Sequence, residues 1–359
     1  MTIIMQNQFI DGATRIREGE ELNKDSLLPY LSSHLENVGN DIDIKQFPSG
    51  FSNLTYLITI ADKEYVLRRP PFGVNIKSAH DMDREFKVLS LLEPIYPSVP
   101  SPILYCKDES IIGAPFYLMD RIKGIILRNK PPEGIPLTSD LMRSISESAI
   151  DNLAALHAIN VNKTGLIDLG KPEGYLQRQV EGWTKRYYNA QTDKIENMDL
   201  IAKWMISNMP TSGSTSFIHN DYKYDNLVLN PRDPSEIIAV LDWEMATVGD
   251  PLMDLGTTLA YWAEENDNPA LKPFNLTWLK GNMTRSEVIE RYALQSGRNT
   301  SDILFYYVFG TFKIAVIVQQ IYARFKKGLT KDFRFAGLIQ VVNACADNGF
   351  KAMNTGQII

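Results

Sequence analysis

The clearest chemistry in this sequence lies in the segment from 219 to 226, HNDYKYDN, and in the triplet DWE that begins at Asp242. A carboxylate such as Asp221 can orient a hydroxyl group and accept its proton, and Lys223 could offset charge on a transferring phosphoryl group. Asn226 and Asp242 offer the hard oxygen ligands that suit Mg²⁺ carrying substrate phosphates. The pattern predicts phosphoryl transfer, against the alternative of solvated acids in a polar turn.

A predicted hairpin explains how these residues could converge. The runs 227–229 and 237–241 are short and apolar, and the turn-forming residues 230–234 join them. Asn226 precedes the first strand and Asp242 follows the second. Because antiparallel pairing folds the chain back on itself, we expect both side chains to face one space.

The rest of the chain divides into a β-rich part and a helical part. Before residue 120 we expect a helix at 27–35, a hairpin of 54–60 with 65–68, a helix that starts at Ser78, and strands at 103–105 and 114–119. After residue 120 we expect helices at 141–157, 285–297, 302–327 and 331–352, and a short strand at 217–218 beside 227–229. The sequence therefore predicts a small β-rich lobe followed by a larger helical lobe.

Composition narrows the class of protein. The 359 residues carry a formal net charge of −6, which argues against a nucleic-acid partner. The two cysteines and four histidines show no zinc-site clustering or disulfide scaffold, and the first residues do not resemble a signal peptide. The longest apolar stretch, 303–323, contains Lys313 and therefore favours a buried helix over a membrane span. We expect a soluble, cytoplasmic protein of undetermined oligomeric state.

The joint spacing of His219, Asp221, Asn226 and Asp242 resembles the aminoglycoside phosphotransferase and choline kinase family. The resemblance implies an α+β, two-lobed, protein-kinase-like fold that uses ATP and Mg²⁺. Asp221 and Lys223 would then be catalytic, and Asn226 and Asp242 would hold the metal. The implied divisions are a nucleotide-binding lobe at 1–119 with an extension at 1–42, a hinge at 120–124, and a catalytic and substrate-binding lobe at 125–359.

The resemblance also implies a nucleotide site in the first lobe. Ser49, Gly50, Ser52 and Asn53 could fold over nucleotide phosphates, although an ordinary β-turn explains these residues equally well. Arg68 stands where kinases usually place lysine, and its guanidinium can also bind phosphate oxygens.

Two further features belong to the same expected nucleotide site. Glu85 lies on the apolar side of its helix and would pair with Arg68, unless it reaches water or pairs with Arg84. Tyr117 and Met119 lie in the strand that resembles the adenine-binding hinge strand, and core packing explains their side chains equally well.

The resemblance extends from about Gln46 to Leu255. Four longer strings, REGEEL at 17–22, YVLRRPP at 65–71, SAH at 78–80 and GYLQRQV at 174–180, resemble the branch found joined to acyl-CoA dehydrogenases. Asp250 and Asp254 would support the loop, and His219 would orient it rather than act as base. The expected function is phosphorylation of a hydroxyl on a small molecule. The alternatives are a catalytically silent nucleotide-binding regulatory module and, with weaker support, a metal-dependent hydrolase.

The acceptor is left open by the sequence. The acidic run 264–267 could receive a cationic amine, as in enzymes that act on aminoglycosides or choline. Three basic residues interleaved with aromatic ones, Arg178, Lys185 and Arg186, could instead receive an anionic hydroxyacyl-CoA or hydroxy acid. Solvated helix faces and a solvated loop explain both sets without any ligand.

Overall fold

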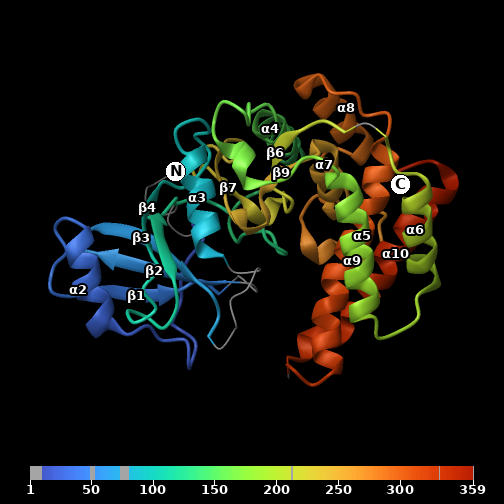
Figure 1. Cartoon of the computed structure of the whole chain (residues 1–359). Coiled ribbons are helices and arrows are strands. Elements are labelled where there is room, and N and C mark those ends of the chain that lie inside the picture. Colours follow the sequence, from blue (N-terminus) through green and yellow to red (C-terminus); the bar gives the residue numbers. More distant parts are fainter. Residues whose placement is uncertain (1–9, 49–52, 73–80, 212, 331, 359) are drawn as a thin grey trace. The chain divides into compact units, whose positions relative to one another are not determined.

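The computed structural model describes residues 10–48, 53–72, 81–211, 213–330 and 332–358 (Figure 1). The chain forms two compact units. Unit 1 comprises Met1–Ile125, Val228–Asp233 and Ile238–Glu244, and unit 2 comprises Ile126–Leu227, Pro234–Ile237 and Met245–Ile359. Two short segments from the second half of the sequence thus pack with the first half, a detail that linear domain boundaries do not capture. The hinge at 120–124 stays a prediction.

Unit 1 is built on one antiparallel sheet of five strands in the order β1-β2-β3-β5-β4. The strands are β1 Asp43–Gln46, β2 Leu54–Ile60, β3 Lys63–Arg69, β4 Pro102–Cys106 and β5 Phe116–Asp120, and the helices are α2 Lys24–His34 and α3 Met82–Leu92. The predicted hairpin of β2 with β3 is confirmed, with Thr55 opposite Arg68 in the register. The predicted start of α3 at Ser78 lies outside the described residues, and Asp81 is the N-cap.

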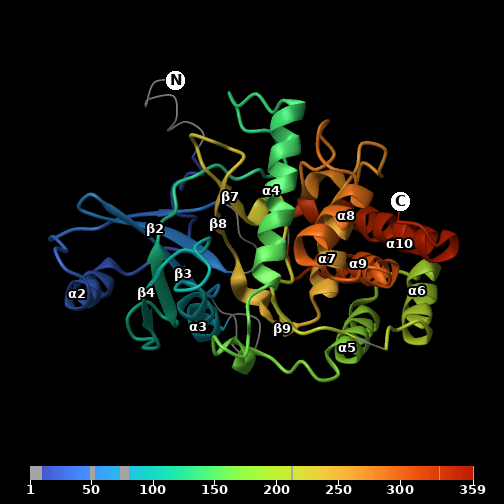
Figure 2. The same ribbon diagram turned by 90° about the horizontal axis from the view of Figure 1, so that it is seen from above.

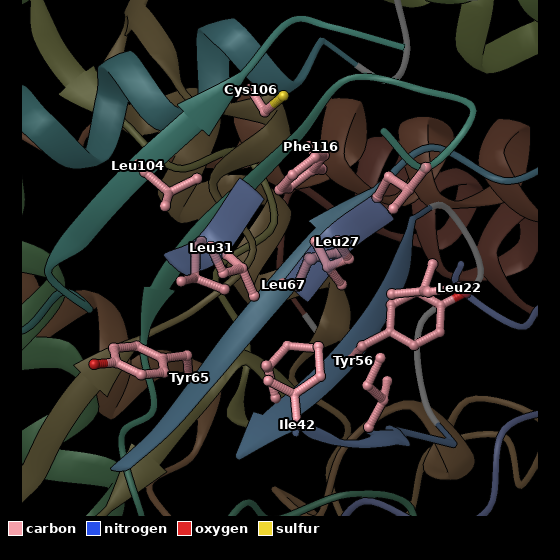
Figure 3. Packing of buried hydrophobic residues seen from close by; sticks show 14 of the residues in the cluster. Leu22, Leu27, Leu31, Ile42, Tyr56, Tyr65, Leu67, Leu104, Cys106 and Phe116 are labelled. Atoms are coloured by element: carbon pink, nitrogen blue, oxygen red, sulfur yellow. The ribbon is translucent and has the colours of Figure 1, made fainter. Parts of the chain in front are cut away.

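Strand alternation separates the two faces of this sheet. Successive side chains along a strand point to opposite faces, so Leu67 and Arg68 of β3 cannot share one. Leu67 joins the buried core beneath α2, together with Leu27 and Leu31 of that helix and Phe116 of β5 (Figure 3). Arg68 consequently projects from the other face, the one that packs against α3.

A second hairpin carries the predicted metal ligands. Strand β7, Leu227–Leu229, pairs with β8, Ile237–Val240, as the sequence predicts. The expected pairing of 217–218 with 227–229 is wrong, because β6, Ser216–Ile218, pairs instead with β9, Thr247–Gly249. The physical reason is the intervening loop: Asn220 adopts a left-handed φ of 68° and a short 3₁₀ turn follows. The chain therefore leaves β6 without turning back along it.

Unit 2 is mainly helical. Its helices are α4 Ser139–His157, α5 Tyr175–Ala190, α6 Glu196–Ser207, α7 Pro251–Tyr261, α8 Arg285–Ser296, α9 Ile303–Lys326 and α10 Leu338–Thr355. Local signals set several ends: Asp250 caps α7, and Thr284 with Glu287 forms a capping box on α8. The predicted helix at 331–352 begins later, at Leu338, because a 3₁₀ segment, Phe333–Gly337, precedes α10.

The long helix α9 contacts α5, α6, α7 and α10 within unit 2 (Figure 2). Its crossing with α7 is very close: a Cβ added to Gly310 would lie 2.3 Å from the carbonyl oxygen of Gly256. Only glycine allows two helix backbones to approach this closely. In the described part of the chain α9 is the one helix long and apolar enough to pass as a membrane span, and 83% of its most apolar window is buried inside the protein. That burial is typical of a core helix.

Candidate active site

The predicted site residues divide between the two units. In unit 1 are Asn53, Arg68, Glu85, Tyr117, Met119 and Asp242, and in unit 2 are Asp221, Lys223 and Asn226. Ser49, Gly50 and Ser52 lie outside the described residues, so their predicted contact with nucleotide phosphates stays a prediction.

A buried ion pair joins β3 to α3 in unit 1. Arg68 Nη1 lies 2.5 Å from Glu85 Oε1, and the two residues are 8% and 1% exposed. Burial raises the pKa of Glu85, and the nearby guanidinium opposes that rise. Burial would lower the pKa of Arg68, but the surrounding carboxylates, Glu85 foremost, raise it well above its usual value. The predicted pair is therefore present, and neither Arg84 nor water takes its place.

This pair still has free hydrogen-bonding capacity. Arg68 Nε and Glu85 Oε2 are buried, and neither makes a hydrogen bond in the described part of the chain. Leaving such groups unsatisfied costs about 1–3 kcal/mol each, or more when they are charged. An unsatisfied buried guanidinium N–H is suited to a ligand that supplies an anionic oxygen.

The same guanidinium reaches the segment that follows β8. Arg68 Nη2 lies 3.2 Å from Asp242 Oδ1 and 3.9 Å from Glu244 Oε2. Asn53 holds Glu244 in turn, since its Nδ2 donates to Glu244 Oε2 over 2.9 Å. Asp242 adopts a left-handed φ of 66°, a conformation that Asp tolerates better than most residues. Three carboxylates thus surround one arginine in unit 1.

This donor set fits a divalent cation that brings its own further ligands. Asp242, with a side chain 35% exposed, can offer a carboxylate oxygen. Among the described residues no three His, Cys, Asp or Glu side chains form a ready-made metal site. Mg²⁺ is commonly held by one or two carboxylates together with substrate phosphates, so the residues present suit that mode.

Tyr117 and Met119 lie on β5, which pairs with β3 on one side and β4 on the other. Tyr117 stands opposite Arg68 in the register and is fully buried. Burial, and then the charge of Glu85, raise the pKa of Tyr117 well above its usual value. Its side chain thus lines the Arg68–Glu85 pair, and contact of Tyr117 or Met119 with adenine stays a prediction.

In unit 2 the loop after β6 presents Asp221. Asn226 Nδ2 donates to the backbone oxygen of Asp221 over 2.8 Å and to its Oδ2 over 3.1 Å. Lys223 Nζ lies 2.9 Å from the same Oδ2. Burial would raise the pKa of Asp221, but the Lys223 ammonium more than offsets this and holds the pKa below its ordinary value. Asp221 is therefore an ionised carboxylate with fixed orientation.

Lys223 is held by this contact. Burial would lower its pKa, and the Asp221 charge raises it well above the usual value instead. Its ammonium also lies 4.8 Å from the centre of the Tyr261 ring, a cation–π distance. In the described structure Lys223 neutralises Asp221, and its predicted action on a phosphoryl group stays a prediction.

A buried carboxylate supports this loop from α7. Asp254 accepts hydrogen bonds from the backbone N–H groups of His219 over 2.6 Å and Asn220 over 2.8 Å. His157 Nε2 lies 3.1 Å from the same carboxylate. His219 Nδ1 accepts from the backbone N–H of Asp221 over 3.2 Å. Asp254 and His219 therefore do structural work in the loop, as predicted.

One residue at this loop was not recognised from the sequence. Lys313 of α9 donates to the carbonyl oxygen of Asn220 over 2.7 Å, and its side chain is almost completely buried. The sequence signal was a single charge in the middle of an apolar helix. That signal indicated burial but not what the charge contacts.

The two regions that the sequence offered for binding the acceptor differ in how their charged side chains are paired. In the acidic run 264–267, Glu264 and Asp267 both contact the buried residue Arg285. Those carboxylates are therefore already compensated. On α5, Arg178 donates to backbone oxygens, whereas Arg186 lies over the ring of Trp183 at 4.7 Å.

Comparison with known proteins adds a family match and several relatives. Residues 43–289 match the model of the Phosphotransferase enzyme family. Acyl-CoA dehydrogenase family member 11 of Homo sapiens is 35% identical over 326 residues, which cover 88% of this chain and 41% of that protein. Acyl-CoA dehydrogenase family member 10 of Mus musculus is 35% identical over 315 residues, which cover 86% and 29%. The chain thus spans less than half the length of these curated relatives.

Solved structures are similar over nearly the whole chain. A Ralstonia eutropha protein described as a candidate aminoglycoside phosphotransferase has a TM-score of 0.79 and 28% identity, covering 93% of this chain and 99% of that one. Choline kinase of Cryptosporidium parvum has a TM-score of 0.59 and 16% identity, covering 92% and 98%. A thermostable variant of aminoglycoside phosphotransferase APH(4)-Ia, in complex with ADP and hygromycin B, has a TM-score of 0.60 and 12% identity, covering 91% and 98%. These likenesses confirm the predicted α+β, two-lobed, protein-kinase-like fold.

Proposed function

The chain belongs to the Phosphotransferase enzyme family, and from that premise we propose that it is a kinase that transfers the γ-phosphoryl group of ATP to a hydroxyl group of a small molecule. The observation that carries this proposal is the environment of Asp221. It is an ionised carboxylate, largely buried, and held by Asn226 and Lys223. Such a group can orient a hydroxyl and take its proton as the new bond forms.

The acceptor oxygen attacks the γ-phosphorus, and its proton passes to Asp221. The bond between the γ-phosphorus and the bridging oxygen breaks, and ADP leaves with the electron pair. Little covalent work falls to the protein, so positioning and charge compensation would supply most of the rate enhancement.

The unit 1 cluster would bind the nucleotide. Arg68 is fixed by Glu85, and its buried Nε–H has no hydrogen-bond partner among the residues that the structure describes. This N–H could bind a phosphate oxygen. Asp242 and Asn226 would hold Mg²⁺, which when bound supplies neutralisation of phosphate charge. Asn53 would fix Glu244 beside that metal ligand.

ATP as the donor is supported by the family and by the ADP complex of one structural neighbour. For the acceptor, the compensated state of Glu264 and Asp267 weighs against a cationic amine such as an aminoglycoside or choline. The relatives' names favour a hydroxy acid or hydroxyacyl-CoA, and Arg186 beside Trp183 on α5 offers a cation for such an acceptor. A soluble, cytoplasmic location, with neither a nucleic-acid partner nor a membrane span, belongs to the same proposal.

The experiment is a transfer assay with ATP labelled on its γ-phosphate, Mg²⁺, and separate pools of hydroxyacyl-CoAs, hydroxy acids, aminoglycosides and amino alcohols. We expect label to appear in a hydroxy acid or hydroxyacyl-CoA as a phosphate monoester. Label in an aminoglycoside would support the kinase activity and show that the proposed acceptor class is wrong. Nucleotide binding without transfer to any pool would favour the regulatory module instead.

A further inference from the structure

Lys313 needs a physical explanation because it places a charge in the interior of unit 2. It lies near the middle of α9, and its side chain is 2% exposed. Burying an ammonium is costly unless it is paired or hydrogen-bonded. The one hydrogen bond recorded for this ammonium in the described structure goes to the backbone oxygen of Asn220, over 2.7 Å. This hydrogen bond orients the ammonium, which also lies 5.8 Å from the centre of the Trp183 ring on α5.

The crossing of α7 and α9 brings Lys313 to this carbonyl. The two backbones touch at Gly256 and Gly310. Asp254 lies on α7 just before that point, and Lys313 lies on α9 just after it. One helix thus presents a carboxylate and the other an ammonium to the same loop.

Together these two groups bind both backbone polar groups of Asn220, its N–H and its C=O. Asp254 accepts from the N–H of Asn220, and Lys313 donates to its C=O. The side chain of Asn220 is fixed as well, by Tyr175 OH over 3.2 Å and by the backbone oxygen of Met245 over 3.1 Å. Asn220 has a left-handed φ of 68°, which Asn tolerates better than most residues, and these contacts hold it in that conformation.

We propose that Lys313 is a positioning residue for phosphoryl transfer: by holding the carbonyl of the Asn220–Asp221 peptide bond, it fixes the direction in which the Asp221 carboxylate points. This inference rests on the proposed kinase function. The carbonyl that Lys313 binds belongs to the peptide unit from which Asp221 begins, so a rotation of that unit would displace the carboxylate. A displacement of about 1 Å at a catalytic group can cost on the order of 10²-fold in rate.

The charge state of Lys313 gives this role a distinct pH dependence. Burial lowers the pKa of Lys313 to about 8, and Asp254 on α7 and Asp221 in the loop oppose that fall. The like charges of Lys223 in the loop and Arg186 on α5 add to it. Loss of the charge above about pH 8 would weaken the hold on Asn220 and lower kcat. Stability should change in the opposite sense, since the unfolded chain binds this proton more tightly and folding becomes more favourable as pH rises.

The first arm of the test is kinetic and uses Lys313→Met, which keeps an unbranched side chain of similar length and removes its charge and donors. We expect kcat to fall on the order of 10- to 100-fold with the KM for ATP nearly unchanged, and the alkaline fall near pH 8 to disappear. Lys313→Arg, which stays charged, should restore part of the rate at pH 9. The matched control is Gln319→Met on the same helix, because Gln319 is also buried and donates to a backbone oxygen, that of Ala190 over 3.0 Å.

The second arm does not depend on activity. Amide hydrogen exchange over residues 219–223 should become at least about tenfold faster in Lys313→Met and stay unchanged in Gln319→Met. If Lys313→Met does not fold, the same exchange in the wild-type chain should accelerate beyond the intrinsic pH effect between pH 7 and 9.5. A wild-type kcat and pH profile in folded Lys313→Met, or unaltered exchange in this loop, would overturn the inference. Absence of any transfer by the wild-type chain would instead contradict the proposed function.

Discussion

The side-chain Nδ2 of Asn226 donates hydrogen bonds to two oxygens of Asp221, the backbone oxygen at 2.8 Å and the carboxylate Oδ2 at 3.1 Å. This contact makes the loop after β6 close on itself. Because the Nδ2 end of the amide is used in this way, the Oδ1 end is the one left to serve as a metal ligand. The pair therefore links the proposed base to the proposed metal site within one loop.

Asp221→Asn should lower kcat on the order of 10²- to 10⁴-fold, because the amide keeps the shape of the side chain but accepts no proton. Nucleotide affinity should stay nearly unchanged, as measured by calorimetric titration of Mg-ATP. Asp225→Asn is the matched control, since Asp225 lies in the same loop and pairs with Arg128 at 2.8 Å. Equal turnover in Asp221→Asn and wild type would remove Asp221 from the mechanism.

Asp242→Asn should weaken Mg²⁺-dependent nucleotide binding at least about tenfold, because a neutral amide is a poorer ligand than a carboxylate. Asparagine suits the test since it tolerates the left-handed φ of 66° at this position. Titration of nucleotide with and without Mg²⁺ measures the effect, and Asp62→Asn in the exposed turn between β2 and β3 is the control. The metal assignment fails if the Mg²⁺ dependence of Asp242→Asn matches that of the wild type.

Asp254→Asn should destabilise the fold by ~1–3 kcal/mol at neutral pH, because the carboxylate accepts two backbone N–H groups. Burial would raise the pKa of Asp254, but the hydrogen bond and charge of His157 lower it below its ordinary value. A carboxyl group with a depressed folded-state pKa stabilises fully above its unfolded pKa and loses that contribution as pH falls through the folded value. The stability gap between wild type and variant should therefore narrow below about pH 4 in denaturant unfolding, and a constant gap would contradict the assignment.

Gly310→Ala should destabilise unit 2 by ~1–3 kcal/mol, because the new Cβ would lie 2.3 Å from the backbone oxygen of Gly256 and force α7 and α9 apart. Gly337→Ala is the control, since a Cβ there meets nothing within 4 Å and the residue has no positive φ. Thermal unfolding of both variants measures the difference. Similar midpoints for the two would show that the crossing tolerates a methyl group.

Local patterns predicted much of this arrangement. The apolar stripe of α3 turned Glu85 toward the core, where a carboxylate needs a counter-charge, and the family resemblance indicated Arg68 as its partner. The turn residues between β7 and β8 were enough to expect that hairpin. Each of these signals acts over a few residues, where geometry follows directly from residue type.

Contacts between distant segments could not be predicted in this way. The negative charges of Glu264 and Asp267 are compensated by Arg285, which lies about 20 residues further along the chain at the start of α8. The hold of Asp254 and Lys313 on Asn220 depends on a close helix crossing. A single sequence marks the glycines and the buried charge but not which segments they bring together.

The proposed phosphoryl transfer depends most on one requirement: Asp242, Asn226 and Asp221 must act on one metal-bound triphosphate. The most direct measurement replaces Mg²⁺ by paramagnetic Mn²⁺ with a non-hydrolysable ATP analogue and records line broadening of labelled side chains by NMR. We predict strong broadening of Asp242 in unit 1 and of Asn226 and Asp221 in unit 2, at one equivalent of metal. Broadening confined to one unit, with the other unaffected at saturating nucleotide, would contradict the proposed site.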